Sequence, residues 1–330
     1  MLGEIPQVRR GTEISIIAEN EPLPKHPILI LGAGKGTGAK IAEQFALQGY
    51  PVIIGTTHQK HYEEVRDQIL SGAGEANIRP FLADITDKDQ IERAYLDLDL
   101  SEGETLHYFP LAAGGIQDVI KLLALEINPI KKKYKKGEEI LREDVDMATT
   151  RIKKTMDERV SGNLANKVNF EGPISVVNFL NCFGHINNSS RIMTLSSSIS
   201  DIYDLDHPEN YPGPYFYQDI AVSKKYFTEQ MQHFAENEGT VYVDLVAPEI
   251  IGTDVGSLLE KLVVMLSSVY SKQELAIPQV TKDQVARAAF TELQKSGAGV
   301  PRVRKAYVNT DGSVSEVRPS SWNKQLVPCF

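Results

Sequence analysis

The stretch ILILGAGKGTGAKIAEQFALQGYPVIIGTT, residues 28–57, decides the fold of this chain. Four apolar residues lead into a loop with glycines at 32, 34, 36 and 38, and an apolar-periodic segment and a second apolar run follow. Strand, glycine turn, helix and strand in this order form the βαβ unit that binds dinucleotides. Glycines let a pyrophosphate approach the backbone, and the helix beginning near Gly38 points free N–H groups at the phosphates. The alternative is a tight strand–helix turn that holds no ligand.

The composition limits the class of protein. The chain has 330 residues, of which 42% are hydrophobic, so it can bury one large core, or one core with an appendage. No apolar run reaches the roughly 18 residues of a membrane span, and the residues MLGEIPQVRRGTE lack a secretory apolar region. The net charge of −9 argues against a general nucleic-acid binder, and the two cysteines, Cys182 and Cys329, suggest neither a disulfide framework nor a metal site. We therefore expect a cytoplasmic protein that binds no metal, nucleic acid or membrane.

Strand-like runs alternate with helical segments along the chain from residue 28. The expected strands are 28–31, 51–55, 78–82, 106–111, 191–195, 240–246 and 305–308. The expected helices are 37–48, 59–70, 87–96, 164–182, 215–236, 257–270 and 281–294. This alternation predicts a doubly wound parallel sheet with helices on both faces, a three-layer αβα arrangement. Residues 1–26 are expected to form an N-terminal arm, and 27–330 a single domain.

A charged, partly helical insertion at about 116–160 interrupts this alternation. Its basic run is followed at once by acidic residues: Lys131, Lys132, Lys133, Lys135 and Lys136, then Glu138, Glu139, Glu143, Asp144 and Asp146. One interpretation is a solvated excursion whose charges compensate locally. The other is a docking surface for an acidic partner, such as a carrier protein or a phosphate-bearing substrate tail.

Several segments follow the glycine loop in a fixed order. They are Asp84 in FLADITD, Ala112-Ala113-Gly114, Asn169 in KVNFEGP, Ser196-Ser197-Ser198, Tyr217 with Lys224, and Pro248 with Thr253 in APEIIGT. With these segments the chain resembles the short-chain dehydrogenase/reductase superfamily over roughly residues 27–315. The resemblance implies a Rossmann-type fold and a nicotinamide cofactor.

The resemblance also implies roles for residues around the cofactor. Leu31 replaces the threonine of the family's TGxxxGxG loop, the asparagines of its NNAG segment are missing, and Glu249 replaces the glycine of its PGxxxT segment. Asp84 matches the aspartate that hydrogen-bonds the adenine edge. The residues expected at the cofactor are Gly32, Gly34, Lys35, Gly36, Thr37, Gly38, Thr57, His58, Asp84, Ile85, Ala112, Ala113, Gly114, Lys224, Pro248, Ile251 and Thr253.

The catalytic pair departs from the family's usual Tyr-x3-Lys. The segment IAVSK has Ile220 in place of the tyrosine, but Tyr217 lies seven residues before Lys224, the Tyr-x6-Lys spacing of the enoyl reductase branch. At about 100° per residue, seven steps bring a helical side chain back to within roughly 20° of its starting direction. Tyr217 and Lys224 are therefore expected to face one site, although Tyr217 could be a packing tyrosine, with Tyr211 and Tyr215 as alternatives.

The resemblance implies hydride transfer with Tyr217 as the acid. A nearby lysine ammonium favours the phenolate and so lowers a phenol pKa that is otherwise about 10. Ser197 would polarise the carbonyl as a hydrogen-bond donor, with Ser196 and Ser198 as alternatives, unless it only caps the strand end. Asn169 would support a water chain to Lys224, or hydrogen-bond a backbone group as an ordinary helix residue.

The end of the second strand predicts the cofactor. Enzymes selective for NAD place an acidic residue there, but here Gly55 is followed by Thr56-Thr57-His58-Gln59-Lys60, with no carboxylate before Glu63. Thr57, His58 and Lys60 suit a 2′-phosphate, and Lys35 adds a cation. We expect NADP(H) rather than NAD(H), unless these are merely exposed residues at a helix start.

The substrate is predicted only by class. The GAGKG loop and the segment 110–113 resemble the ketoreductase domain of fungal-type fatty acid synthases, whereas Tyr-x6-Lys resembles enoyl reductases. Both branches act on acyl thioesters, so a 3-oxoacyl or 2-enoyl thioester, bound to CoA or a carrier protein, is expected. Residues 257–270 could cover an acyl chain or form a core or dimer helix. The family also implies a homodimer or homotetramer. The alternative is a sensor or scaffold that keeps the nucleotide site without turnover.

Overall fold

In the computed structural model, the glycine-rich stretch forms the expected βαβ unit. Strand β1 (Ile28–Leu31) leads into helix α1 (Gly36–Leu47), and β2 (Val52–Thr56) returns parallel to β1. Every residue of β1 is buried, as in a parallel strand covered by helices on both faces. The residues that the structure describes are 24–111, 125–126, 128–133, 135–158, 166–210, 218–251, 279–295, 300–319 and 322.

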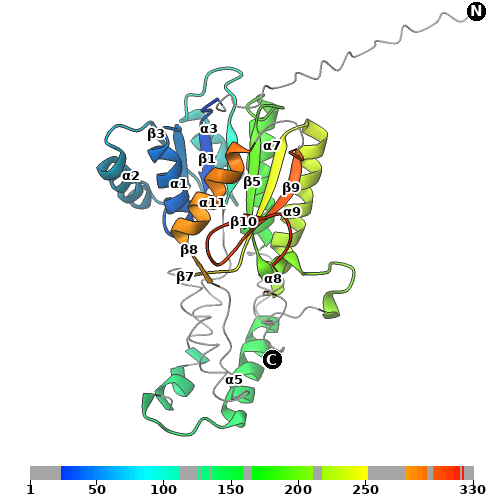
Figure 1. Ribbon diagram of the computed structural model, residues 1–330. Helices are drawn as coiled ribbons and strands as arrows, with labels where there is room; N and C mark the ends of the chain where they lie inside the picture. The colour runs from blue at the N-terminus through cyan, green and yellow to red at the C-terminus, as the bar shows by residue number, and fades with distance from the viewer. Residues whose placement is uncertain are drawn as a thin grey trace, which may run out of the picture.

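Eight strands form one sheet in the order β10-β9-β6-β5-β4-β1-β2-β3 (Figure 1). Neighbouring strands are parallel except β9 and β10, which form an antiparallel pair. The order reverses at β1, and such a reversal is where open α/β sheets bind ligands, at the carboxyl ends of the strands. The further strands of this sheet are β3 (Ile78–Leu82), β4 (His107–Pro110), β5 (Arg191–Ser197), β6 (Val241–Ala247), β9 (Val303–Val308) and β10 (Val314–Ser315).

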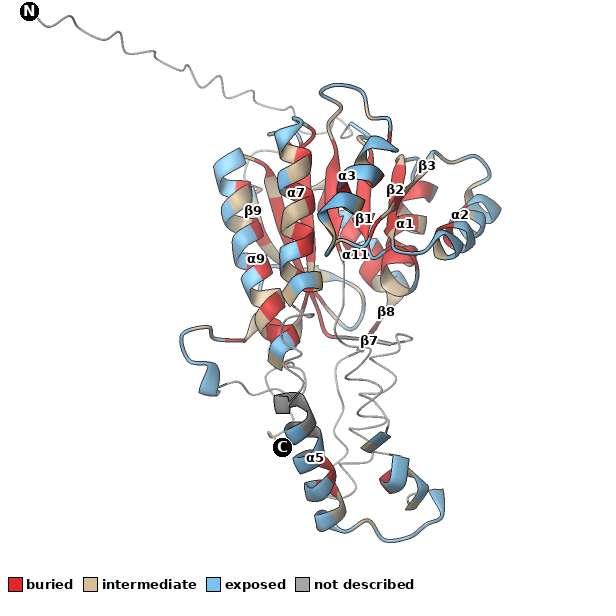
Figure 2. Ribbon diagram, turned by 180° about the vertical axis from the view of Figure 1, so that it is seen from behind, coloured by how far each residue is buried: buried red, intermediate tan, exposed pale blue. Residues whose placement is uncertain are grey.

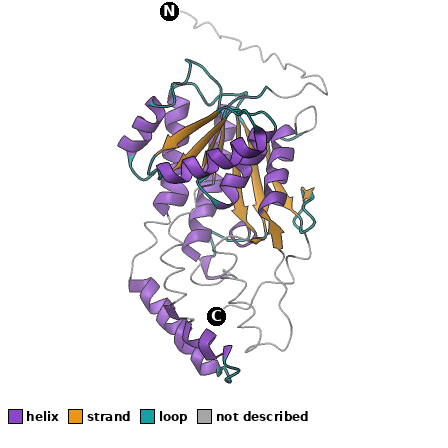
Figure 3. Cartoon of the chain, turned by 90° about the vertical axis from the view of Figure 1, so that its left-hand side faces the viewer, coloured by secondary structure: helices purple, strands orange, loops and turns teal. Residues whose placement is uncertain are grey.

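Helices cover both faces of the sheet. Ile28 and Ile30 pack with α1, α2 and α11, whereas Leu29 and Leu31 pack with α3, α7 and α9. Figure 2 shows α3, α7 and α9 over one face with their buried sides toward the strands, and Figure 3 shows the layers edge-on. The further helices of these layers are α2 (Gln59–Ala73), α3 (Lys88–Leu96), α7 (Gly172–Cys182), α9 (Gln218–Glu238) and α11 (Lys282–Gln294). The predicted three-layer doubly wound sheet is confirmed.

Some elements differ from the sequence-based expectation. The expected helix at 164–182 contains a π-helical segment, η1 (Lys167–Glu171), before α7. Several short elements were not predicted from the sequence. They are α8 (Ser198–Asp201), the 3-10 turn η2 (Pro208–Asn210), β10, and the parallel pair of β7 (Glu249–Ile251) and β8 (Gln279–Thr281). Elements this short have no periodic apolar signal. The expected helix 257–270 and most of the arm lie outside the described residues.

The charged insertion contains helix α5 (Arg142–Glu158), which lies beyond the carboxyl ends of the strands, away from the sheet (Figure 1). Lys133 pairs with Asp144 at 2.8 Å, and Lys136 lies 3.5 Å from Glu138. These pairs agree with local charge compensation, and the docking role stays a prediction. No helix in the described part of the chain has the length and apolar character needed to cross a bilayer.

A buried histidine lies at the amino end of β4. The side chain of His107 is 2% exposed, and its Nδ1 accepts the backbone N–H of Arg191 at 3.2 Å. Its Nε2 has no hydrogen-bond partner among the described residues, and the ring of His26 lies edge-on at 5.4 Å. Burial, followed by the charges of His26 and Arg191, lowers the pKa of His107 from 6.5 to about 3. The folded protein therefore keeps this imidazole neutral.

We expect the free energy of unfolding to fall as the pH is lowered from 6.5 toward 3, because the unfolded chain binds a proton at His107 in that range and the folded chain does not. One proton corresponds to a slope of about 1.4 kcal/mol per pH unit. In His107→Asn, whose amide oxygen can accept the Arg191 N–H, urea unfolding between pH 4.5 and 5.5 should show a slope lower by about that amount. An equal slope in the two proteins would contradict the assignment.

Candidate active site

The glycine loop between β1 and α1 needs its glycines for two different reasons. Gly32 and Gly36 have φ angles of +72° and +66°, in the left-handed region that favours glycine. At Gly34 a Cβ atom would lie 2.4 Å from the Thr56 hydroxyl oxygen, and at Gly38 it would lie 2.4 Å from the Gly32 carbonyl oxygen. The loop is therefore a backbone surface that side chains would fill.

The amino end of α1 opens onto this loop. Lys35 is the N-cap residue, its side chain makes no capping hydrogen bond, and the first turn, which includes Thr37, has no acidic residue. The backbone N–H of Ala39 bonds the Lys35 carbonyl at 3.4 Å, so the preceding N–H groups have no intrahelical acceptor. Such a helix start binds anions, and the loop therefore fits the diphosphate of a dinucleotide.

The end of β2 carries polar residues next to the glycine loop. Thr57 and His58 are exposed, and the first turn of α2 has no acidic residue. Lys60 lies on α2, and its ammonium is 3.7 Å from the carboxylate of Glu64. Glu64 therefore competes with a cofactor 2′-phosphate for this cation. His61 was not predicted as a site residue, although it lies next to the glycine loop. Its Cβ is 3.1 Å from the position that a Cβ on Gly34 would take, and its ring meets the His58 ring edge-on with centroids 5.1 Å apart.

The loop after β3 carries the residues expected at the adenine. One carboxylate oxygen of Asp84, Oδ1, accepts hydrogen bonds from the backbone N–H and the hydroxyl of Thr86 at 2.9 and 2.8 Å. These bonds fix the exposed turn that contains Ile85. A Cβ at Gly172 would lie 2.7 Å from the Ile85 carbonyl oxygen, so this glycine lets α7 approach the loop closely.

Asn169 connects two helices. Its side chain is 2% exposed, and its Nδ2 donates to the Ser223 hydroxyl of α9 at 3.2 Å. The Ser223 hydroxyl in turn donates to the carbonyl of Ile220 at 3.0 Å. Ile220, which the resemblance places at the position of the tyrosine, is 4% exposed. The usual tyrosine position on α9 is therefore a buried apolar position in this chain.

Lys224 and Lys225 point in different directions from α9, as their helical spacing predicts. The Lys224 ammonium lies 3.5 Å from the Leu195 carbonyl oxygen near the end of β5. The Lys225 ammonium lies 3.8 Å from Glu229, one turn along the same helix. Only the first of these two lysines reaches the carboxyl edge of the sheet.

The three candidate serines have different surroundings. Ser196 is 5% exposed and donates to the carboxylate of Asp244 at 2.6 Å, so its hydroxyl is used in the core. Asp244 is buried on β6, and this burial raises its pKa although Ser196 and Thr194 donate to it. Ser198 is the first residue of α8. Ser196 is therefore the least suitable of the three as a donor to a ligand.

Ser197 caps α8. Its hydroxyl oxygen accepts the Ser200 backbone N–H at 3.1 Å, which is the capping role left open by the sequence. The Ser200 hydroxyl donates to the Ser197 carbonyl at 2.9 Å and lies 2.9 Å from the Ser197 hydroxyl. Because the Ser200 proton is used in this way, the Ser197 proton points either to Ser200 or to a ligand. Capping and donation to a ligand are compatible.

Five expected site residues lie outside the described residues: Tyr217, Ala112, Ala113, Gly114 and Thr253. Their roles stay predictions. Pro248 is buried directly before β7, and Ile251 is the last residue of that strand. Most of the described site residues come from the carboxyl ends of β1, β2, β3, β5 and β6 or the loops after them, and Asn169 and Lys224 come from η1 and α9. The residues at the strand ends therefore gather at the carboxyl edge of one sheet.

Comparison with known proteins agrees with this arrangement. Residues 26–118, which span β1 to β4, match the family model described as short chain dehydrogenase. Over these residues the chain is similar to that family. No curated protein sequence matched the chain.

Solved structures share the fold at low identity. An alcohol dehydrogenase from the archaeon Thermococcus sibiricus, complexed with 5-hydroxy-NADP, is 14% identical with a TM-score of 0.54; the match covers 89% of this chain and 99% of that one. A 7α-hydroxysteroid dehydrogenase complexed with NADH and 7-oxo glycochenodeoxycholic acid is 16% identical with a TM-score of 0.55, covering 90% and 97%. A variant of the actinorhodin polyketide ketoreductase with NADPH is 12% identical with a TM-score of 0.54, covering 87% and 98%.

The Gly38→Ala variant tests the glycine loop. Its Cβ would collide with backbone at Gly32, so we expect NADPH affinity, measured by fluorescence titration, to fall at least about tenfold, as loss of the diphosphate contacts would give. Gly72→Ala, on α2, is the matched control, since the nearest atom to its new Cβ would be a side-chain carbon of Leu47 at 3.8 Å. This control should bind NADPH as the wild type does. Equal affinity in both variants would remove the loop from the nucleotide site.

Proposed function

We propose that this protein is an NADP(H)-dependent oxidoreductase that reduces the carbonyl or enoyl group of an acyl thioester. The observation that carries the proposal is the position of Lys224: its ammonium reaches the end of β5, which closes with Ser197, at the same sheet edge as the glycine loop. A cation and a hydroxyl at the edge where a dinucleotide would bind are the groups needed to polarise a substrate oxygen.

The chain's own residues supply binding and proton transfer, while the bound nicotinamide supplies the hydride. Gly32–Gly38 would hold the diphosphate at the start of α1. Lys224 would hold the ribose hydroxyls and favour the phenolate of Tyr217. Tyr217 would donate the proton, and the Ser197 hydroxyl, oriented by its capping bond to Ser200, would donate a hydrogen bond to the same substrate oxygen. Asn169 would orient α9 through Ser223.

The preference for NADP(H) is supported by the charge around the end of β2. The exposed residues Lys35, Thr57 and His58 offer donors, and no carboxylate occupies the first turn of α2 to bind a ribose 2′-hydroxyl. Solved structures of the same fold contain either NADPH or NADH, so the fold alone does not select the cofactor. We further propose that the acyl chain arrives on CoA or a carrier protein, and that the protein acts as a homodimer or homotetramer.

A second candidate is a nucleotide-binding sensor or scaffold without turnover. The buried Ile220 in the usual tyrosine position favours it, because a phenol then has to come from another residue, such as Tyr217, three residues earlier in the sequence. This candidate predicts NADPH binding and no NADPH oxidation with any substrate tested. Turnover of a thioester by the wild-type protein separates the two candidates.

We expect Lys224→Ala to lower kcat for NADPH oxidation with a short 3-oxoacyl or 2-enoyl thioester by about 100-fold or more, the size of a lost acid–base contribution. Lys225→Ala, whose ammonium faces Glu229, should retain wild-type kcat and is the matched control. Tyr217→Phe should lose activity as Lys224→Ala does. An unchanged rate in Tyr217→Phe would remove this tyrosine from the mechanism, and no turnover by the wild type would favour the sensor.

Lys35→Ala should weaken NADPH binding and leave NADH binding nearly unchanged, because an exposed cation next to the nucleotide distinguishes the two cofactors only through the 2′-phosphate. A charge-assisted hydrogen bond contributes about 1.5–3 kcal/mol, so the NADPH dissociation constant should rise by about 10- to 100-fold. Calorimetric titration with both cofactors measures the difference. A proportional loss of both affinities would mean that Lys35 contacts the shared diphosphate instead.

A further inference from the structure

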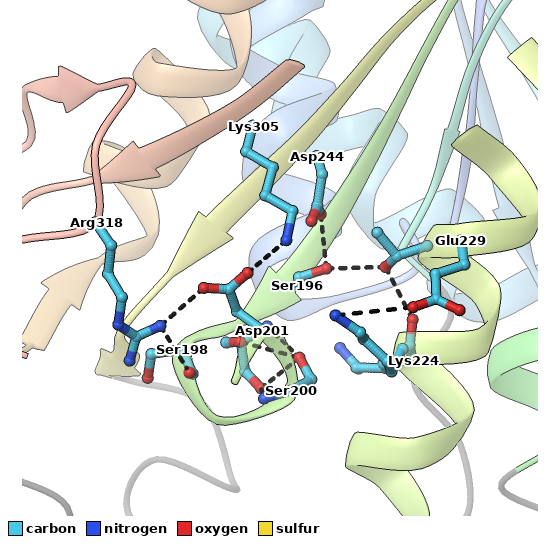
Figure 4. A network of polar contacts seen from close by, with 12 residues as sticks. Ser196, Ser198, Ser200, Asp201, Lys224, Glu229, Asp244, Lys305 and Arg318 are labelled. Carbon is cyan, nitrogen blue, oxygen red and sulfur yellow. Dashed lines mark hydrogen bonds and ion pairs between the residues drawn. The ribbon is translucent and has the colours of Figure 1, made fainter. Parts of the chain in front are cut away.

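A buried carboxylate at the end of α8 is held by two cations. The side chain of Asp201 is 6% exposed; its Oδ1 lies 2.7 Å from the Lys305 ammonium and its Oδ2 lies 2.8 Å from the Arg318 guanidinium. Lys305 comes from β9, and Arg318 follows β10 (Figure 4). Both oxygens of one carboxylate are thus bound by residues from the last part of the chain.

Arg318 makes a second contact to the same helix. Its guanidinium donates to the Ser198 carbonyl at 3.2 Å, so one side chain bridges the first and last residues of α8. The guanidinium also lies 5.4 Å from the ring centroid of Trp322, which packs edge-on against Tyr307 of β9. Arg318 is therefore itself fixed by packing.

We propose that Asp201, Lys305 and Arg318, the latch, position the Ser197 hydroxyl for the reaction. This inference rests on the proposed function. Asp201 and Arg318 are positioning residues, since they act through α8.

The reason is the length of α8. A helix of one turn does not form stably by itself, because nucleation fixes several residues for a single hydrogen bond. The capping bond from the Ser200 N–H to Ser197 exists only while this turn is formed. The latch binds the turn at Ser198 and at Asp201, on both sides of Ser200. Loss of the latch would therefore release Ser197 from its capped orientation.

The charges around the latch stabilise its ion pairs. The hydrogen bond and charge of Asp201 and the charge of Asp244 raise the pKa of Lys305, although burial alone would lower it. Lys305 thus stays an ammonium between two buried carboxylates from α8 and β6. Asp201 is paired with two cations, so a variant that lacks Arg318 keeps the ion pair between Asp201 and Lys305.

The test compares Arg318→Gln and Asp201→Asn with the matched control Arg79→Gln. Arg79, on β3, also bridges a backbone carbonyl and a carboxylate, those of Leu98 and Glu104, at 3.1 and 3.4 Å. We expect kcat to fall about 10- to 100-fold in both latch variants, with an unchanged NADPH dissociation constant, because misplacement of a catalytic group by about 1 Å has effects of this size. Arg79→Gln should keep wild-type kcat.

Two further measurements separate positioning from general stability. Hydrogen exchange of the amides of residues 198–201 should become at least about tenfold faster in Arg318→Gln, while α1 amides keep their rates. In a Ser197→Ala background, Arg318→Gln should lower kcat no further, because the two changes act on one group.

Additive effects in that double variant, or unchanged exchange at α8, would overturn the latch. An equal loss of kcat in Arg79→Gln would do the same. If the wild type turns over none of the thioesters, the proposed function fails, and the exchange measurement alone then decides whether the latch holds α8.

Discussion

The parallel pairing of β1 with β2 on one side and β4 on the other is the constraint on which the rest of the molecule depends. β1 is buried along its whole length, and it can be so only because its backbone groups bond two neighbours and its alternate side chains meet two helix layers. Parallel strands bring their carboxyl ends to one edge. Loops that are far apart in the sequence therefore meet there.

The glycine loop turns that edge into a surface for an anion. The contact between Gly38 and the Gly32 carbonyl sets how α1 leaves β1, and Gly34 packs on Thr56 at the end of β2. A side chain at either position would push the helix start away from the sheet. Close backbone packing, rather than any polar side chain, is thus what exposes the first N–H groups of α1.

Polar contacts in the other half of the sheet hold the part of the site that contains Ser197 and Lys224. Ser196 and Asp244 join β5 to β6, and Asp201 ties α8 to Lys305 and Arg318 (Figure 4). Asn169 joins η1 to α9 through Ser223. Each contact links elements separated by tens of residues or more. The position of Ser197 and Lys224 is therefore a property of the assembled sheet, while the nucleotide-binding half is mostly local in sequence.

The sequence by itself determined the fold class, the glycine loop and the main strands and helices of the sheet, including β5, β6, β9, α9 and α11, because apolar periodicity and glycine spacing are local signals. It also separated Lys224 from Lys225, since helical geometry fixes the angle between neighbours. Sequence reasoning could not choose among Ser196, Ser197 and Ser198, nor find His61 or the latch of Asp201, Lys305 and Arg318. Those depend on which side chains meet across the sheet, and such pairings between distant segments are decided only when the tertiary structure forms.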